Sequence, residues 1–544
     1  MFQVNKETLS LEMRDGIRLD ADVYWPQSAK SFPVLLMRQP YGRKIASTVV
    51  YAHPIWYASQ GYIVVIQDVR GRGTSEGKFQ LFVNEIADGL DTINWVSQLP
   101  GSTGKVGMYG FSYQGMTQLY VAASQPKALK VICPAMIAYD LYNDWGYENG
   151  AFCLQTNLGW AIQLAAETAR LKGDITRFQK LYAAARNLPL FDPIPAHPNL
   201  LKEFASGSFY HDWLNHPYPD NYWAELSPKS FMDKLDLPML HIGGWFDPYL
   251  RGTLNLYEAM LTKSQHLQHL IIGPWGHLPW SQKVGSLNYT KAAISSVDQL
   301  QINWFNYFLK SKENYPLNCD PVTLFEMGSN QWEEFNSFPT NEQCSYYLFS
   351  QGLANIREDD GQLVDSFPSK TMTDIIVHDP WRPVPSLGGH AGIPSGSFDR
   401  SSIDGRSDVL TYTTEPFKED LLIVGDSFIE IYCTADTPSF DVSAILSEVF
   451  SDGKVYNFTQ GYMRVNSDKL PLKIPFQTTC KKIAQGNCLR LSISGACFPA
   501  YALNTGTGKL PNEERLIDAQ TITLTITSQG HKSSYLSLPI KQNS

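Results

Sequence analysis

The chain has 544 residues, of which 43% are hydrophobic and 18% are charged, and its formal net charge is −9. This length exceeds what one hydrophobic core fills, so we expect two or three domains. The acidic balance argues against a nucleic-acid partner and against an anionic membrane surface, because both attract clustered Lys and Arg. We find no signal-peptide pattern, no apolar run of membrane-spanning length and no CxxC spacing among the eight cysteines. We therefore expect a cytoplasmic protein with free thiols.

Strand and helix signals alternate through the first part of the chain. Residues 9–26 alternate around Asp15-Gly16, which predicts a hairpin. Short apolar runs then predict strands buried on both faces of a parallel sheet. These strands are expected at 33–41, 62–68, 105–110 and 128–136, with helices at 85–98 and 112–125. The alternation predicts an α/β sheet with helices on both faces.

The pattern changes twice further along the chain. From about 137 to 233 it indicates helices without β-branched runs, which we interpret as a helical insertion. The sheet resumes with strands at 237–247 and 269–277 and a helix at 297–310. After 345 short alternating strands and turn signals predict an antiparallel β-sandwich. The expected domains are the α/β core at 1–136 and 234–345, the insertion at 137–233 and the sandwich at 346–544.

The stretch "GFSYQG" places Ser112 between Gly110 and Gly115, at the junction of a predicted strand and helix. A residue in so sharp a turn has a strained backbone, and its neighbours must be small. The pattern predicts the nucleophile elbow of an α/β-hydrolase. The serine hydroxyl would lie above the carboxyl edge of the sheet. The N–H of Tyr113, at the helix N-terminus, would face a developing oxyanion.

A serine nucleophile needs a base that a carboxylate orients, and in this fold the chain order is Ser, acid, His. Asp247 ends one apolar strand and His277 ends the next, on the same sheet edge as Ser112. We predict these three residues as a catalytic triad. The alternative for Asp247 is a helix N-cap before Pro248.

The other histidines near these strands have simpler interpretations. His241 lies within the strand that Asp247 ends, and we expect an interior histidine with its hydrogen bonds satisfied. His266 and His269 precede their strand, and we expect them to face solvent.

Several motifs together resemble one family, the cocaine esterase-like branch of the X-prolyl dipeptidyl peptidase superfamily, which also holds the α-amino acid ester hydrolases. The motifs are "RQPYGR", "QDVRGRGTSEG", "GFSYQG", "GGWFD", "GPWGH", "VPSLGGH" and "RSDVLTYTTEP". The resemblance covers nearly the whole chain. It implies an α/β-hydrolase core, an inserted helical cap and a C-terminal jelly roll, in agreement with the division above.

The resemblance also implies roles for individual residues. Ser112, Asp247 and His277 match the family triad, and Tyr41 of "RQPYGR" matches a tyrosine whose hydroxyl completes the oxyanion hole beside the Tyr113 amide. Positions that match an aromatic acyl pocket are Trp145, Trp160 and Tyr249. The alternative for Tyr41 and for these three aromatic residues is packing in an aromatic-rich chain.

The loop "QDVRGRGTSEG", residues 67–77, is polar and strongly patterned. Its Asp68, Arg70 and Arg72 could suggest a phosphate or metal site, but no phosphate-loop pattern and no metal-ligand spacing accompany them. We interpret it as a structural loop in which Asp68 and an arginine form an ion pair. We expect no metal and no cofactor.

Departures from the family pattern bear on the substrate. Relatives that hydrolyse α-amino acid esters carry acidic residues that hold the substrate ammonium, partly just after the triad acid; here the residues at 248–251 are Pro-Tyr-Leu-Arg. The chain begins directly with the predicted core strands, so we expect no extra N-terminal domain of the kind that the large dipeptidyl peptidases carry. Both differences favour an esterase for a small ester. A short-peptide substrate, with Xaa-Pro dipeptidyl-peptidase or amidase activity, is the alternative. A silent β-sandwich binding protein is a second alternative, and the oligomeric state stays open.

Overall fold

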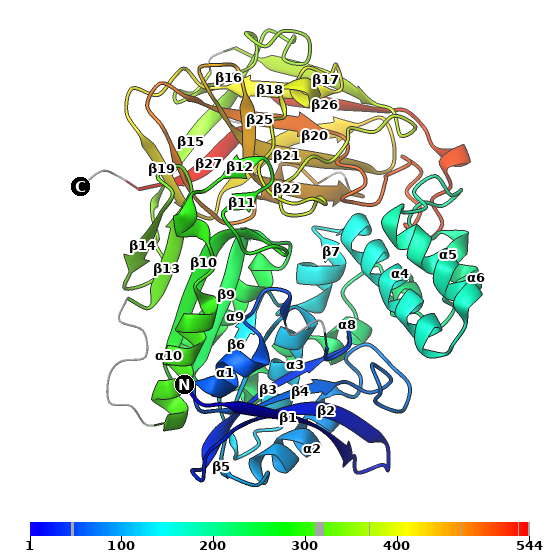
Figure 1. Cartoon of the computed structure of the whole chain (residues 1–544). Coiled ribbons are helices and arrows are strands. Elements are labelled where there is room, and N and C mark those ends of the chain that lie inside the picture. Colours follow the sequence, from blue (N-terminus) through cyan, green and yellow to red (C-terminus); the bar gives the residue numbers. More distant parts are fainter. Residues whose placement is uncertain (45–47, 311–319, 369, 468, 531, 542–544) are drawn as a thin grey trace.

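The structure, a computed structural model, describes residues 1–44, 48–310, 320–368, 370–467, 469–530 and 532–541. Figure 1 shows a strand-rich domain above, a mixed α/β core below it and a group of helices at the side of both. Among the described residues we find no helix whose length and hydropathy would suit a membrane span. The seven described cysteines are free thiols.

The core is built on one ten-stranded sheet. Its strands are β1 (Val4–Glu12), β2 (Arg18–Pro26), β3 (Phe32–Gln39), β4 (Ile63–Asp68), β5 (Ser102–Phe111), β6 (Leu129–Ala135), β9 (Met239–Phe246), β10 (Gln268–Gly276), β13 (Val322–Glu326) and β14 (Gln331–Phe335). The strand order is β1-β2-β4-β3-β5-β6-β9-β10-β13-β14. From β4 to β13 all neighbours pair in parallel. The carboxyl ends of β3, β5, β9 and β10 therefore lie at one edge of the sheet.

Helices cover both faces of this sheet. They are α1 (Pro54–Ser59), α2 (Glu85–Ser97), α3 (Tyr113–Ala122), α9 (Leu250–Lys263) and α10 (Val297–Lys310). In β3, Val34 and Leu36 belong to one hydrophobic cluster, and Leu35 and Met37 belong to another. Successive strand side chains point to opposite faces, so two cores flank the sheet. This is the doubly covered arrangement that the continuous apolar runs predict.

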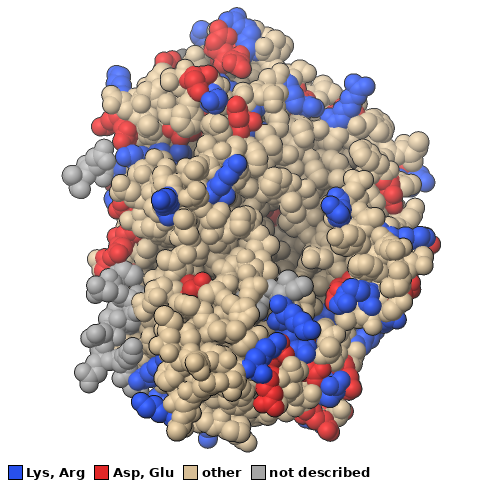
Figure 2. All heavy atoms as spheres, in the orientation of Figure 1, with Lys and Arg blue, Asp and Glu red and all other residues tan. Residues whose placement is uncertain are grey.

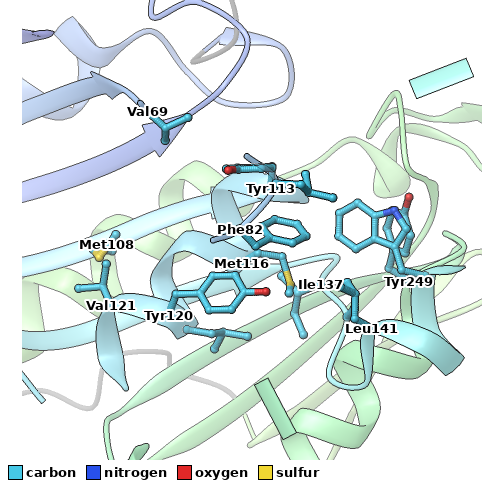
Figure 3. Packing of buried hydrophobic residues seen from close by; sticks show 14 of the residues in the cluster. Val69, Phe82, Met108, Tyr113, Met116, Tyr120, Val121, Ile137, Leu141 and Tyr249 are labelled. Carbon is cyan, nitrogen blue, oxygen red and sulfur yellow. The ribbon is translucent and has the colours of Figure 1, made fainter. Parts of the chain in front are cut away.

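The packing beneath α3 is aromatic. The Phe82 ring stacks on Tyr113 at 4.7 Å between centroids and lies 5.4 Å from the Tyr120 ring. Figure 3 shows these three rings beside Met116, with Ile137 close by. All five residues belong to one buried cluster. The start of α3 is thereby held rigidly against the sheet.

The cap lies between β6 and β9 in the sequence. Its elements are η2 (Tyr142–Gly146), β7 (Tyr147–Glu148), β8 (Ala151–Phe152), α4 (Leu154–Leu171), α5 (Ile175–Arg186), α6 (Asn199–Phe204), α7 (Phe209–Asn215), α8 (Asn221–Leu226) and η3 (Pro228–Lys234). The inner side chains of α4, such as Leu158, Ile162 and Ala169, are buried in the same cluster as the α3 face of the core. The cap therefore packs directly on the core.

The C-terminal domain is almost entirely strand. Its strands are β15 (Glu342–Phe349), β16 (Gln362–Val364), β17 (Met372–His378), β18 (Val409–Thr413), β19 (Leu421–Gly425), β20 (Phe428–Ala435), β21 (Phe440–Val449), β22 (Val455–Val465), β23 (Leu472–Pro475), β24 (Thr479–Ile483), β25 (Cys488–Ser494), β26 (Ile522–Ser528) and β27 (Tyr535–Ile540). Nearly all of the pairs are antiparallel. Trp245 and Phe246 of β9 share a hydrophobic cluster with Ile474 and Phe476 of this domain. The C-terminal domain therefore packs against the end of β9.

The sequence patterns did not predict every element. The hairpin of β13 and β14 extends the core sheet, although the "QWEEF" stretch of β14 is polar and lies at the sheet edge. The expected limit at 345/346 falls inside β15, so the division is better placed between β14 and β15. Smaller elements are β11 (Lys283–Val284), β12 (Leu287–Asn288), η4 (Lys291–Ala293), α11 (Ser401–Asp404) and η5 (Leu516–Asp518).

Candidate active site

Ser112 occupies the sharp turn between β5 and α3. Its backbone has φ 58° and ψ −128°, a conformation that L-residues rarely adopt. The flanking glycines leave the room this turn requires. A Cβ at Gly110, where φ is +142°, would lie 2.4 Å from Gln114 Cβ, and one at Gly115 would lie 2.4 Å from Ile137 Cγ2. This is the local geometry that the "GFSYQG" pattern predicts.

Asp247 and His277 follow the neighbouring parallel strands β9 and β10. Asp247 Oδ1 lies 2.8 Å from His277 Nδ1. The carboxylate is placed to accept a hydrogen bond from Nδ1–H, the tautomer in which Nε2 carries the free lone pair. Asp247 is fully buried, which raises the pKa of its carboxyl, while the hydrogen bond and charge of His277 oppose that rise. Helix α9 has Tyr249 as its N-cap residue, and the backbone of Tyr249 also hydrogen-bonds the Asp247 carboxyl.

The elbow and the Asp247–His277 pair meet at the same sheet edge. The ring of Phe111, the residue before Ser112, lies 5.4 Å from the His277 ring. The Tyr249 ring lies 5.0 Å from His277 on another side. Figure 2 shows this face of the molecule hollowed where the core, the cap and the strand-rich domain meet.

Tyr41 follows β3 and lies beside Ser112. Its hydroxyl accepts a hydrogen bond from Trp160 Nε1 at 3.1 Å and shares one with the Ser112 side chain. An indole N–H can only donate, so the Tyr41 proton is free to point toward Ser112. Burial raises the pKa of Tyr41 to about 12, although the hydrogen bond from Trp160, the charge of Arg72 and the hydrogen bond with Ser112 oppose it. The hydroxyl therefore stays protonated, as a hydrogen-bond donor must.

Tyr113 contributes its backbone rather than its side chain. Its hydroxyl donates to Glu85 Oε1 at 2.7 Å, inside the core. The amide is the first of α3, and the first N–H groups of a helix have no intrahelical acceptor. A role of Tyr113 at an oxyanion would therefore fall to its backbone N–H and not to its hydroxyl.

The three expected pocket residues form one aromatic cluster. The ring of Trp145 lies 4.3 Å from Tyr249 and 5.1 Å from Trp160, between centroids. The cluster therefore runs from Tyr41, through Trp160, to the ring that touches His277. The sequence patterns missed Phe209 and Trp213, which extend it from α7. Their spacing does not distinguish a pocket aromatic from a core aromatic.

Gln477 reaches this site from the strand-rich domain, and no sequence pattern predicted it. Its side chain is buried, and its Nε2 donates to the backbone oxygens of Trp245 at 2.9 Å and Asp247 at 3.1 Å. A single amide therefore holds the end of β9 on which Asp247 lies. Only the contact between the two domains reveals this role of Gln477. Such a contact leaves no local pattern in the sequence.

Replacing Gln477 with leucine should destabilise the protein. The buried Trp245 oxygen would lose the Gln477 donor, and the Asp247 oxygen would keep only the bond from the Leu250 N–H at 3.3 Å, a loss that costs about 1–3 kcal/mol in the free energy of unfolding. Urea unfolding of Q477L against wild type measures this loss. The matched control is Q343L at an exposed position of β15; an equal loss in both variants would contradict the assignment.

In the loop at 67–77, Asp68 forms an ion pair with an arginine, as expected. The arginine that binds Asp68 is Arg43, of "RQPYGR", at 2.5 Å. Arg70 pairs instead with Asp88 at 2.6 Å. Arg72 takes part in no ion pair within the described part of the chain. Long-range partners of this kind cannot be assigned from sequence spacing.

The three histidines near the predicted strands, His241, His266 and His269, have different surroundings. His241 is buried, its Nε2 lies 2.9 Å from Gln268 Oε1, and burial lowers its pKa to about 4. His266 is exposed as expected. The expectation for His269 was wrong: β10 begins at Gln268, so this histidine lies inside the sheet and is fully buried.

Comparison with known proteins agrees with this architecture. The family model for X-Pro dipeptidyl-peptidase (S15 family) matches residues 15–279, and the model for the X-Pro dipeptidyl-peptidase C-terminal non-catalytic domain matches residues 318–537. Cocaine esterase of Rhodococcus sp. (strain MB1 Bresler) is 28% identical, with 97% of each chain covered. An aminopeptidase from the archaeon Thaumarchaeota archaeon has a similar fold, with a TM-score of 0.83 at 22% identity, covering 99% of this chain and 97% of that chain.

An α-amino acid ester hydrolase also shares the fold, with a TM-score of 0.81 at 22% identity and the same coverage of 99% and 97%. The two family models lie side by side and the curated relative spans both. The chain is thus a hydrolase of the X-Pro dipeptidyl-peptidase (S15) family, and it is similar along its length to a cocaine esterase.

Proposed function

We propose that the protein hydrolyses carboxylic esters through an acyl-enzyme on Ser112. The observation that carries this proposal is the 2.8 Å contact of Asp247 with His277 Nδ1, at the sheet edge where the strained Ser112 turn also lies. His277 takes the Ser112 proton as the hydroxyl attacks the ester carbonyl and then gives that proton to the leaving alcohol. Water repeats the sequence on the acyl-enzyme. Asp247 keeps the imidazole in one tautomer and stabilises the imidazolium.

The oxyanion of each tetrahedral intermediate would be held by two donors. They are the Tyr41 hydroxyl, which is hydrogen-bonded with Ser112, and the Tyr113 N–H at the start of α3. Trp160 supports the first by donating to the Tyr41 oxygen, so the phenol proton is directed away from the cap. Donors held in place before reaction stabilise developing charge without reorganisation.

Replacing Tyr41 with phenylalanine should lower kcat about 10²- to 10³-fold and leave KM nearly unchanged. The ring would still fill its place while the oxyanion loses one donor. Steady-state hydrolysis of a 4-nitrophenyl ester measures both constants. The matched control is Tyr57→Phe, which removes the hydroxyl of a buried core tyrosine bonded to Asp298. Equal losses of kcat in the two variants would contradict the role of Tyr41.

An aromatic wall favours an uncharged acyl group. Trp145, Trp160 and Tyr249 form a continuous aromatic cluster that reaches the His277 ring, and an acyl pocket beside it would be apolar. The cap does carry a buried carboxylate, Glu148, but Arg251 lies 3.0 Å from it. The site therefore has little to offer a substrate ammonium.

The pKa of Glu148 supports the same conclusion. Although burial alone would raise it, the charges of Arg251 and His390 and a hydrogen bond from Tyr501 hold this pKa down to about 2. The carboxylate is already ionised and neutralised by groups of the chain. A free amino terminus, which a dipeptidyl peptidase must bind, would compete with them.

A comparison of substrates tests the proposal. Esters of 4-nitrophenol with acyl groups of increasing bulk should be cleaved, with kcat/KM highest for aromatic or branched acyl groups, and Xaa-Pro anilides should be poor substrates. Faster cleavage of the anilides would replace the esterase with a dipeptidyl peptidase on the same residues. A silent binding protein would cleave neither class and would not react with a fluorophosphonate.

A further inference from the structure

Arg72 is a buried cation without a carboxylate partner. Arg72 is among the most deeply buried of the described residues, with 1% of its surface exposed. The other fully buried arginine of the core, Arg38, lies 2.5 Å from Glu85. No ion pair among the described residues includes Arg72, and its Nε is buried without a hydrogen-bond partner. Isolating a charge in this way is costly, so an unpaired guanidinium is a candidate for a functional group.

The contacts of Arg72 place it next to the cap side of the oxyanion site. Its Nη1 donates to the backbone oxygen of Leu164 in α4 at 3.2 Å. Trp160, one turn earlier on the same face of α4, donates to the Tyr41 hydroxyl at 3.1 Å. The same face of α4 therefore hydrogen-bonds both the Arg72 guanidinium and the Tyr41 hydroxyl.

A second set of contacts links Arg72 to the side chain of Tyr113, the residue that begins α3. The guanidinium carbon of Arg72 lies 3.8 Å from the centre of the Phe79 ring. That ring lies 6.1 Å from the ring of Tyr113. Arg72 thus contacts Leu164 with one edge of its guanidinium and Phe79 with its flat face.

The guanidinium keeps its charge in this setting. Burial lowers the pKa of Arg72 to about 10, which is still above neutral pH, while Tyr113, Glu167 and Tyr41 act in the opposite direction. Glu167 is partnered by Arg170 at 2.7 Å. The field of Arg72 also lowers the pKa of Tyr41, against the effect of burial. A phenol polarised in this way is a stronger hydrogen-bond donor.

We propose that Arg72 is a positioning residue of the oxyanion site: held by Leu164 and Phe79, its charge polarises the Tyr41 hydroxyl and offsets the negative charge that forms on the substrate oxygen. The inference rests on the proposed acyl-enzyme function. Among the described residues no carboxylate forms an ion pair with Arg72, Glu167 acts on it only through space, and the tetrahedral intermediate would bring a negative charge to the site. The charge therefore stabilises the transition state more than the bound substrate, which raises kcat rather than lowering KM.

Two variants separate charge from hydrogen bonding. Arg72→Gln keeps a donor for the Leu164 oxygen and removes the charge, whereas Arg72→Lys keeps the charge. With a neutral 4-nitrophenyl ester, R72Q should lower kcat about tenfold or more with KM within twofold, and R72K should restore most of the rate. The matched control is R70K, in the same loop, whose arginine is paired with Asp88; its kcat should stay near that of the wild type.

A double-mutant cycle with Tyr41→Phe tests the route of the effect. If Arg72 acts through the Tyr41 hydroxyl, R72Q should change kcat much less in the Y41F background than in the wild type. Equal factors in both backgrounds, or R72K as slow as R72Q, would overturn the proposal in favour of a structural role. An R72Q effect on KM alone, confined to esters with a carboxylate in the acyl group, would overturn it in favour of a substrate-anion site.

Two further measurements keep the outcome decisive. Should R72Q fail to fold, R72K answers alone, because a kcat below a tenth of the wild type in the folded R72K protein would overturn the role of charge. Fluorophosphonate labelling of the wild type is carried out alongside. A wild type without label refutes the proposed function itself, whereas normal labelling with unchanged R72Q kinetics refutes only the role of Arg72.

Discussion

Replacing Ser112 with alanine will abolish ester hydrolysis, lowering kcat about 10⁵- to 10⁶-fold, as expected when the nucleophile of a triad is removed. The loss is this large because no acyl-enzyme can form without the serine hydroxyl. The His277–Asp247 pair and the oxyanion donors remain, but they have no covalent intermediate to act on. Stopped-time assays with a 4-nitrophenyl ester at high enzyme concentration measure the residual rate. Far-UV circular dichroism shows whether the variant is folded.

The control for this change is Ser124→Ala, at the other end of the same helix, where the residue is partly exposed. Its activity should equal that of the wild type within a factor of two. If S112A kept more than a hundredth of the wild-type rate while folded, Ser112 would not be the nucleophile, and a water-based mechanism would have to replace the acyl-enzyme.

Replacing Asp247 with asparagine should lower kcat about 10⁴-fold while substrate binding changes little. The Asn amide would occupy the same volume, but it can donate to Nδ1 and so favours the wrong imidazole tautomer. It also removes the charge that stabilises the imidazolium. The measurement is kcat and KM over pH 6–9, together with the thermal midpoint of unfolding.

The matched control for this second change is Asp236→Asn, at the opposite end of the strand that Asp247 follows. Asp236 is exposed and accepts a hydrogen bond from Ser264 at 2.7 Å. It should leave kcat unchanged. A D247N variant that loses stability but keeps its kcat would make Asp247 a structural residue and the triad wrong.

Local chemistry explains why much of the core was predictable. The elbow needs Gly110 and Gly115 because any side chain there would meet Gln114 or Ile137. Strands buried on both faces give continuous apolar runs, so β9 and β10 were recognisable, with Asp247 and His277 directly after them. In this fold the functional residues lie at the ends of strands. The sequence shows these ends as the points where an apolar run stops.

Other parts of the site depend on contacts between distant segments. Gln477 lies 230 residues after Asp247 in the sequence. A glutamine in a β-rich stretch does not indicate which distant residue it will contact. Asp68 pairs with Arg43 and not with an arginine of its own loop. The burial of His269 depends on where its strand starts, to within a residue or two, and strand ends are the least predictable feature of a pattern.

The most direct test is the reaction of the folded protein with a fluorophosphonate, followed by peptide mapping in a mass spectrometer. The proposal rests on a single activated hydroxyl at one edge of the sheet. It predicts one label per chain, on the peptide that contains Ser112, and a loss of labelling in H277A. A folded protein that takes up no label, or one labelled at another serine, would contradict the account.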